Sequence, residues 1–166
     1  MVIDKEEAKK VSRKQIQFLQ NDDPLFEPLN NASIGNPIMV KNVFRQPSYW
    51  LVPLLKKDRV AGFVRVLLNG KIAHIGTFYR PASELHYNPT VVTGIESSRA
   101  FKMATERIRK EVETASEPAF VHDGPIGREA WLVEVSMYGK PNRWIFVTAQ
   151  GVYERRAGQT LDSTIK

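Results

Sequence analysis

The 166-residue sequence contains no cysteine. This absence excludes disulfides, thiol catalysis and cysteine-ligated zinc or iron–sulfur centres. No segment approaches the roughly 20 apolar residues that a membrane-spanning helix needs, and no apolar run of signal-peptide length follows a basic start at the N-terminus. We therefore expect a cytoplasmic protein without a membrane span, unless a signal or anchor has been removed from the sequence.

Histidine is also scarce, since the sequence contains only three: His74, His86 and His122. No two of them have the spacing of paired metal ligands. The sequence also lacks a glycine-rich phosphate loop, a dinucleotide-binding fingerprint and the glycine spacing of a serine nucleophile elbow. We therefore expect no catalytic residue, metal or other cofactor, and the sequence favours a protein that is not an enzyme.

The composition is that of a globular domain, with 42% hydrophobic and 25% charged residues. Lys and Arg number 24 against 18 Asp and Glu, which gives a net charge of +6. The excess lies in the first half, because residues 1–85 carry 13 basic and 8 acidic side chains while residues 86–166 carry 11 and 10. A basic protein attracts anionic partners over long range, so the first half is where we look for such a surface.

The first element predicted from the sequence is a charged helix over residues 5–20. Asp4 and Glu7 have the spacing of a capping box, and an apolar stripe of helical period follows. An alternative interpretation is a nucleic-acid-binding protein. Its binding surface would consist of the basic side chains of this helix and of the turn at residues 56–59. The residues concerned are Lys9, Lys10, Arg13, Lys56, Lys57 and Arg59. No RNA-binding motif accompanies them.

Extended runs of β-forming residues follow that helix, and a second helix and further runs follow them. The dipeptide Asn69-Gly70 favours a tight hairpin turn. Thr93 and Glu96 repeat the capping-box spacing and predict a longer helix over residues 94–115. The predicted strands cover residues 38–44, 49–55, 62–68, 71–78, 129–138, 143–149 and 152–157. Each half of the chain therefore reads as a helix followed by an antiparallel meander.

The two halves also coincide when one is shifted by 81 residues. Trp50-Leu51-Val52 then falls on Trp131-Leu132-Val133, and Asn69-Gly70 falls on Gln150-Gly151. A constant shift across strand, turn and strand preserves the hairpin register and the face that each side chain occupies. We therefore predict an α+β fold of two helix-plus-meander repeats packed together, residues 1–84 and 85–166, either as two domains or as one continuous pseudo-symmetric domain.

The pattern of each half resembles the PepSY and cystatin-like families. The segments that carry the resemblance best are Trp131-Leu132-Val133-Glu134-Val135 and the run from Trp144 to Tyr153. The resemblance implies a cystatin-like helix-plus-meander fold. It also implies a non-catalytic binding or regulatory module whose partner is a protein such as a peptidase.

Residues 143–148 place large apolar side chains on both faces of a strand, Trp144 and Phe146 on one and Ile145 and Val147 on the other. A sheet with two apolar faces needs two covers. The helices, the other repeat or a second copy of the chain could supply the second cover, so a homodimer is one alternative.

The remaining candidate residues are His122 and Asp123, which lie in the predicted loop 122–128. A loop imidazole beside a carboxylate would suit a small-molecule enzyme, which is the second alternative. However, adjacent side chains usually point apart, and Gly124-Pro125 explains Asp123 as a turn former. The candidate surface for a ligand or partner is either the concave face of the sheet or this loop together with loops 30–37 and 81–90.

Overall fold

The computed structural model describes residues 2–19, 24–78 and 82–161. It is an α+β protein whose strands pair mostly antiparallel, which confirms the predicted fold class at this coarse level. The chain divides into two compact units, Met1–Met39 with Ser48–Val92 (unit 1) and Val40–Pro47 with Thr93–Lys166 (unit 2). The predicted division into repeats at residues 84 and 85 stays a prediction.

Unit 1 begins with the predicted helix, which the structure places at α1 (Lys5–Leu19); residue 20 lies outside the described residues. Asp4 starts the helix as expected, because its Oδ1 accepts a hydrogen bond from the backbone N–H of Glu7 at 2.8 Å. The predicted meander is confirmed as well. The other elements of unit 1 are η1 (Pro24–Leu29), β1 (Ser33–Ile34), β3 (Pro47–Lys56), β4 (Arg59–Leu67), β5 (Ile72–Thr77) and η2 (Ala82–Tyr87).

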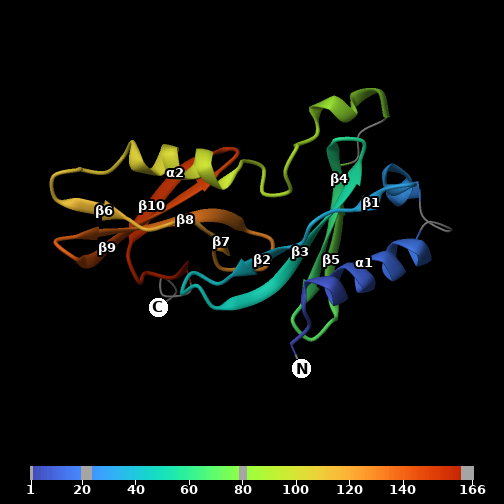
Figure 1. Ribbon diagram of the computed structural model, residues 1–166, viewed down its shortest axis with the longest axis horizontal. Helices are drawn as coiled ribbons and strands as arrows, with labels where there is room; N and C mark the ends of the chain where they lie inside the picture. Colours follow the sequence, from blue (N-terminus) through green and yellow to red (C-terminus); the bar gives the residue numbers. More distant parts are fainter. Residues whose placement is uncertain (1, 20–23, 79–81, 162–166) are drawn as a thin grey trace. The chain divides into compact units, whose positions relative to one another are not determined.

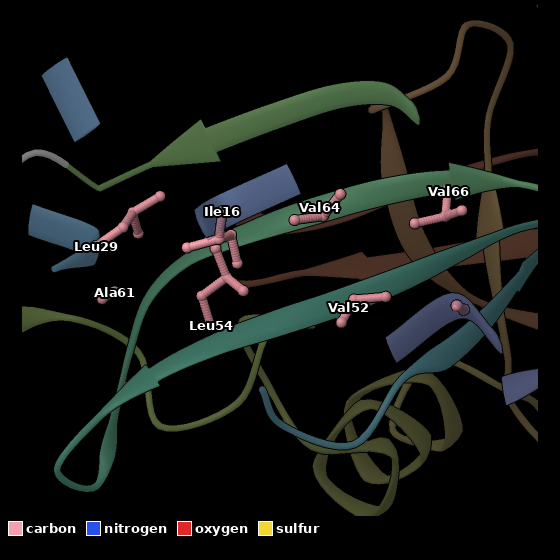
Figure 2. Close-up of a cluster of buried hydrophobic side chains, with 8 residues drawn as sticks. Ile16, Leu29, Val52, Leu54, Ala61, Val64 and Val66 are labelled. Atoms are coloured by element: carbon pink, nitrogen blue, oxygen red, sulfur yellow. The ribbon is translucent and has the colours of Figure 1, made fainter. Parts of the chain in front are cut away.

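The core of unit 1 lies between α1, η1 and one face of its strands (Figure 1). Alternate residues of β3 and β4 point to this face, as the period of a strand requires. Figure 2 shows Ile16 of α1 and Leu29 of η1 beside these strand residues. The buried set is Ala8, Ile16, Leu29, Val52, Leu54, Ala61, Val64 and Val66.

Unit 2 contains α2 (Ser97–Thr105), which lies along strands of its sheet (Figure 1). Its strands follow the order β10-β9-β8-β7-β2, with β6 paired to β8. β2 and β7 pair in parallel, and the other pairs of this unit are antiparallel. The strands are β2 (Ile38–Lys41), β6 (Glu113–Ala115), β7 (Ala119–His122), β8 (Glu129–Met137), β9 (Lys140–Thr148) and β10 (Gly151–Arg156).

The predicted long helix over residues 94–115 is wrong in its second half. α2 ends at Thr105, and β6 then pairs with β8. The predicted capping box is also absent, because Glu96 makes no side-chain cap bond and Thr93 Oγ1 donates to the carbonyl of Ile95 instead. Tertiary contacts therefore override the helical pattern of this segment.

The residue that holds the end of this segment is Glu113, whose side chain is fully buried. Its carboxylate accepts a hydrogen bond from Arg143 Nη2 at 3.0 Å and from the backbone N–H of Arg109 at 2.8 Å. These two bonds lower the pKa of Glu113 from 4.5 to about 2, and the bond from Arg143 has the larger effect. A continued helix would lift the carboxylate out of this pair.

The hairpin β3–β4 of unit 1 and the hairpin β8–β9 of unit 2 have the same register under the shift of 81 residues. Trp50 lies opposite Val66, and Trp131 lies opposite Val147. The register shifts after Leu54 in one hairpin and after Val135, the corresponding residue, in the other. The sequence pattern therefore corresponds to two hairpins of one geometry.

The two tryptophans also make the same bond. Trp50 Nε1 donates to the carbonyl of Ile3 at 3.2 Å, and Trp131 Nε1 donates to the carbonyl of Ile95 at 2.9 Å. Each acceptor lies two residues before a helix, α1 or α2. The separation from acceptor to tryptophan is 47 positions in unit 1 and 36 in unit 2, so the connection from helix to hairpin differs in length.

The sheet of unit 2 is apolar on both faces, as the sequence predicted for residues 143–148. Ile145 and Val147 belong to the cluster under α2, and Trp144 and Phe146 belong to a second cluster. Val43, from the turn after β2, is buried in that second cluster. Unit 2 itself therefore supplies part of the second cover.

Candidate interaction surface

Two turns of unit 2, at residues 42–46 and 123–128, carry exposed side chains. They follow β2 and β7, and Lys41 pairs with Val121 in the parallel ladder between these strands. Because these strands pair in parallel at Lys41 and Val121, the two turns begin at the same end of the pair. We call residues 42–46 and 123–128 the paired-turn surface.

The first turn is held by Asn42. Its Oδ1 accepts hydrogen bonds from the backbone N–H groups of Phe44 and Gln46, each at 3.0 Å. The backbone N–H of Asn42 donates to the carbonyl of Gln46 at 2.9 Å. This side chain therefore satisfies the turn from within, as Asn does in many turns.

Two large side chains project from this turn. Phe44 is 58% exposed and meets Trp144 edge-on, with ring centroids 5.9 Å apart. Arg45 adopts a φ of 64° and donates from Nη2 to Ser116 Oγ at 2.6 Å and to the carbonyl of Glu117 at 3.1 Å. These acceptors are neutral oxygens that fix the guanidinium, and within the described residues Arg45 makes no salt bridge.

The second turn is closed by its backbone and by the imidazole of His122. The N–H of Asp123 donates to the carbonyl of Arg128 at 2.8 Å, and His122 Nδ1 donates to the carbonyl of Gly124 at 2.8 Å. Gly124 and Gly127 adopt φ angles of 86° and 98°, which only glycine adopts readily. The sequence Gly-Pro-Ile-Gly therefore forms a tight projection.

The carboxylate of Asp123 points into unit 2 and is 1% exposed. It accepts hydrogen bonds from Tyr153 OH at 2.8 Å and from both terminal nitrogens of Arg155, of which Nη1 is at 3.0 Å. Burial raises the pKa of Tyr153 to about 12, and the hydrogen bond to Asp123 is the second largest cause of this shift. Asp123 therefore ties the second turn to β10.

Aromatic rings enclose this buried pair. The Arg155 guanidinium lies 4.6 Å from the ring centroid of Phe146, and Phe146 stacks on Tyr153 with centroids 4.9 Å apart. Such stacking stabilises a desolvated guanidinium. The anchor of the second turn is thus a packed ionic cluster, whereas Asn42 anchors the first turn locally.

The exposed part of the paired-turn surface combines apolar and positive groups. Ile126 is 48% exposed, and Arg128 has 51% of its side chain exposed. Arg45 is exposed as well, and the carboxylate of Asp123 is buried. Each turn therefore presents one large apolar side chain and one arginine.

The predicted site residues fall into separate groups. Six of them lie in unit 1, where Lys9 pairs with Glu6 at 2.9 Å and Lys10 with Glu7 at 3.5 Å along α1. Arg13 is exposed on the same helix. Lys56 ends β3 and pairs in the ladder with Arg59, Lys57 lies in the turn between them, and Arg59 Nη1 donates to the carbonyl of Asn88 at 3.1 Å. His122 and Asp123 lie in unit 2.

The three predicted loops differ in how they are bonded to the strands and in which side chains they expose. In loop 30–37, Gly35 donates its N–H to the carbonyl of Pro53 at 2.8 Å, which ties that loop to β3. In loop 81–90, of which residue 81 lies outside the described residues, Asn88 is 4% exposed and donates to the carbonyl of Val60. Loop 122–128 carries the exposed Ile126 and Arg128.

The sequence interpretation missed Phe44 and Arg45 because it extended a strand to residue 44. β2 ends at Lys41, and Asn42 begins the turn. The sequence did contain a signal for this turn. Under the shift of 81 residues, Asn42 corresponds to Asp123, which begins the predicted loop after residue 122.

Within the described residues, no three His, Asp or Glu side chains are grouped so that they could hold a metal ion. No described helix combines the length and the apolar character that crossing a membrane requires. No protein-family model, curated protein or solved structure matches the chain.

Proposed function

We propose that this chain is a duplicated helix-plus-meander protein, cystatin-like and PepSY-like in plan, that acts as a non-catalytic module for binding a protein partner such as a peptidase. The common register of the hairpins β3–β4 and β8–β9 supports the duplication. The matching bonds from Trp50 and Trp131 to the start of a helix support it further.

The observation that carries the binding role is the paired-turn surface. Phe44 and Ile126 are large and exposed, they lie on turns that follow two paired strands, and each turn is fixed by hydrogen bonds. Rigid turns lose little conformational entropy when a partner binds. Exposed aromatic and arginine side chains are the residue types that contribute most to protein interfaces.

The alternative nucleic-acid surface on α1 has less support. Lys9 and Lys10 are paired with Glu6 and Glu7. Ion pairs of this spacing are ordinary on an exposed helix. The enzyme alternative at His122 and Asp123 has less support as well, because the carboxylate of Asp123 is engaged by Arg155 and Tyr153.

The test uses a photo-cross-linking amino acid placed at Phe44 or at Ile126. The matched control carries it at Tyr138, which is 78% exposed in the turn between β8 and β9 of the same unit. The full chain is irradiated in lysate of its native cells, and cross-linked proteins are identified by mass spectrometry. We expect one protein to be captured from both turn positions and not from position 138.

The captured protein is then purified and mixed with the purified chain. Binding should be lost in the double variant Phe44→Ala/Ile126→Ala and kept in Tyr138→Ala. Equal capture from position 138, or unchanged binding by the double variant, would exclude the paired-turn surface as the interface. Turnover of a small-molecule substrate that depends on His122 and Asp123 would replace the proposal with the enzyme alternative.

A further inference from the structure

We propose that the paired-turn surface selects a partner with an acidic surface, and that Arg45 and Arg128 are its specificity-determining residues. This inference rests on the proposed binding function. It goes further by giving the chemistry of the partner, apolar contact groups flanked by carboxylates. It also gives each arginine a recognition role in addition to its contacts within the fold.

The charge of the exposed residues points to an acidic partner. Of the exposed residues in the two turns, only Arg45 and Arg128 are charged, and both are positive. The carboxylate within the turns, Asp123, is buried against Arg155. A partner that approaches these turns therefore meets positive charge around two apolar side chains, and carboxylates complement it.

The two guanidinium groups differ in how they are held, and within the described residues neither makes a salt bridge to an exposed carboxylate. Arg45 is bound by Ser116 Oγ and by the carbonyl of Glu117. Arg128 Nε lies 3.9 Å from Asp123 Oδ2, but that carboxylate already accepts the bidentate contact of Arg155. One buried negative charge thus serves two arginines, so positive charge remains at the surface.

Each arginine is close in sequence to the apolar anchor of its own turn. Arg45 follows Phe44 directly, and Arg128 lies two residues after Ile126 in a turn closed by the bond from the N–H of Arg128 to the carbonyl of Pro125. A guanidinium can bind a carboxylate through two parallel hydrogen bonds. A partner with acidic side chains beside an apolar pocket would engage both groups of a turn.

A nucleic acid would supply negative charge as well, but it fits the apolar half of the surface less well. Single strands bind by stacking successive bases on aromatic rings. The paired-turn surface offers one exposed ring, Phe44, and the second anchor is the aliphatic Ile126. The observations therefore favour a protein, and a nucleic acid becomes an outcome of the test.

The experiment selects ligands for the full chain from a phage-displayed library of short random peptides. We expect selected sequences rich in Asp and Glu next to a large apolar residue. A synthetic peptide of the best sequence should bind about tenfold more tightly than its counterpart with Asn and Gln in place of Asp and Glu. Added salt should weaken the acidic peptide more than the neutral one.

Three variants test whether Arg45 and Arg128 cause the preference for the acidic peptide. Arg45→Glu/Arg128→Glu should lose the preference for the acidic peptide, and Arg45→Gln/Arg128→Gln should reduce it while keeping side chains that form hydrogen bonds. The control Lys140→Glu changes an exposed charge at the far turn of the β8–β9 hairpin and should keep the preference. Circular dichroism checks that each variant is folded.

The failing outcomes are distinct. A library that yields no binder, yields binders without excess acidic residues, or yields a preference unchanged in both double variants overturns this inference. A single-stranded oligonucleotide that displaces the acidic peptide at equal affinity would show a nucleic-acid surface instead. If the cross-linking experiment succeeds while these charge tests fail, the binding function stands and the acidic partner does not.

Discussion

The hairpins β3–β4 and β8–β9 share a backbone register, yet the polar contacts around them differ. Glu113 and Arg143 form a buried pair in unit 2, and the corresponding positions in unit 1 under the shift of 81 residues are Ala32 and Gly62. The register is set by strand pairing and one shift in each hairpin. Backbone geometry can therefore be retained while the polar contacts around it change completely.

The face toward the helix differs least between the two hairpins. Val52 and Val64 of unit 1 correspond to Val133 and Ile145 of unit 2, and all four are fully buried. On the opposite face, Arg65 corresponds to Phe146. Packing against a helix restricts residue type, because a close-packed interior tolerates few changes of volume or polarity.

The largest expected difference is between the two anchors of the paired-turn surface, Asn42 and Asp123, both of which lie in unit 2. Asp123→Ala leaves the buried guanidinium of Arg155 without its partner and should cost about 3–5 kcal/mol in the free energy of unfolding. The matched variant Asn42→Ala removes only local turn bonds and should cost about 1 kcal/mol. Urea denaturation measures both. Equal losses would show that the two turns are anchored alike.

A second difference concerns the residue opposite the aromatic side chain of β4 or β9. Phe63 lies opposite Gly76, and Trp144 lies opposite Arg155. The ring of Phe63 fills the place where Gly76 would carry a Cβ atom, so Gly76→Ala should cost up to about 3 kcal/mol by overpacking. Ala73→Ser, at an exposed position on the same strand, should stay within about 0.5 kcal/mol. A Gly76→Ala protein of wild-type stability in urea would contradict this packing.

Substituting the two tryptophans tests whether their indoles hold equivalent places in unit 1 and unit 2. Trp50→Phe and Trp131→Phe each remove one hydrogen bond to a carbonyl before a helix and should each cost about 1 kcal/mol. Amide hydrogen exchange should accelerate in the first turn of α1 in the first variant and of α2 in the second.

Trp144→Phe is the control for this pair. Its indole donates to Glu134 rather than to a helix start, so exchange at both helices should stay unchanged. If Trp50→Phe left α1 unaffected while Trp131→Phe loosened α2, the indoles would not hold equivalent places.

The Glu113–Arg143 pair should show itself in acid. The unfolded chain binds a proton at Glu113 near pH 4.5, whereas the folded protein resists protonation until about pH 2. Proton uptake therefore favours the unfolded state as the pH falls through this range, so the contribution of the pair is present above pH 4.5 and is lost toward pH 2. In Glu113→Gln, the free energy of unfolding should therefore depend less steeply on pH between pH 4.5 and about 2 than it does in the wild-type protein. An unchanged slope would place the acid sensitivity elsewhere.

The smallest expected effect concerns the hairpin turns. Tyr138 and Gly139 have φ angles of 50° and 76°, which suit Asn-Gly best. Tyr138→Asn should stabilise the protein by at most about 0.5 kcal/mol in thermal unfolding. Lys57, at the corresponding position of unit 1, has a φ of 53° but is followed by Asp58, which lacks the positive φ of Gly139. Lys57→Asn should therefore gain less than Tyr138→Asn, and a larger gain would contradict the difference between the turns.

Much of the fold could be predicted because its signals are local. Asp4 caps α1, the apolar stripe gives the helix its extent, and alternating residues give β4 and β9 their faces. The shift of 81 residues also has a counterpart in the hairpin register. Each of these signals lies within a few residues or within one hairpin.

The candidate surface could be predicted only in part. Asp123 was singled out, but its partners Tyr153 and Arg155 lie about 30 positions further along the chain. Arg45 bonds to Ser116, 71 positions away. No local pattern contains such pairs, because they form only when the fold brings distant segments together.

The sequence by itself determined the element types, the hairpin register and the apolar faces, since propensity, turn chemistry and side-chain period act over short distances. Tertiary structure decided where α2 ends, which carboxylates are buried and which exposed side chains stand side by side. Those features depend on burial and charge pairing between distant segments, and they appear only when the sheet has formed.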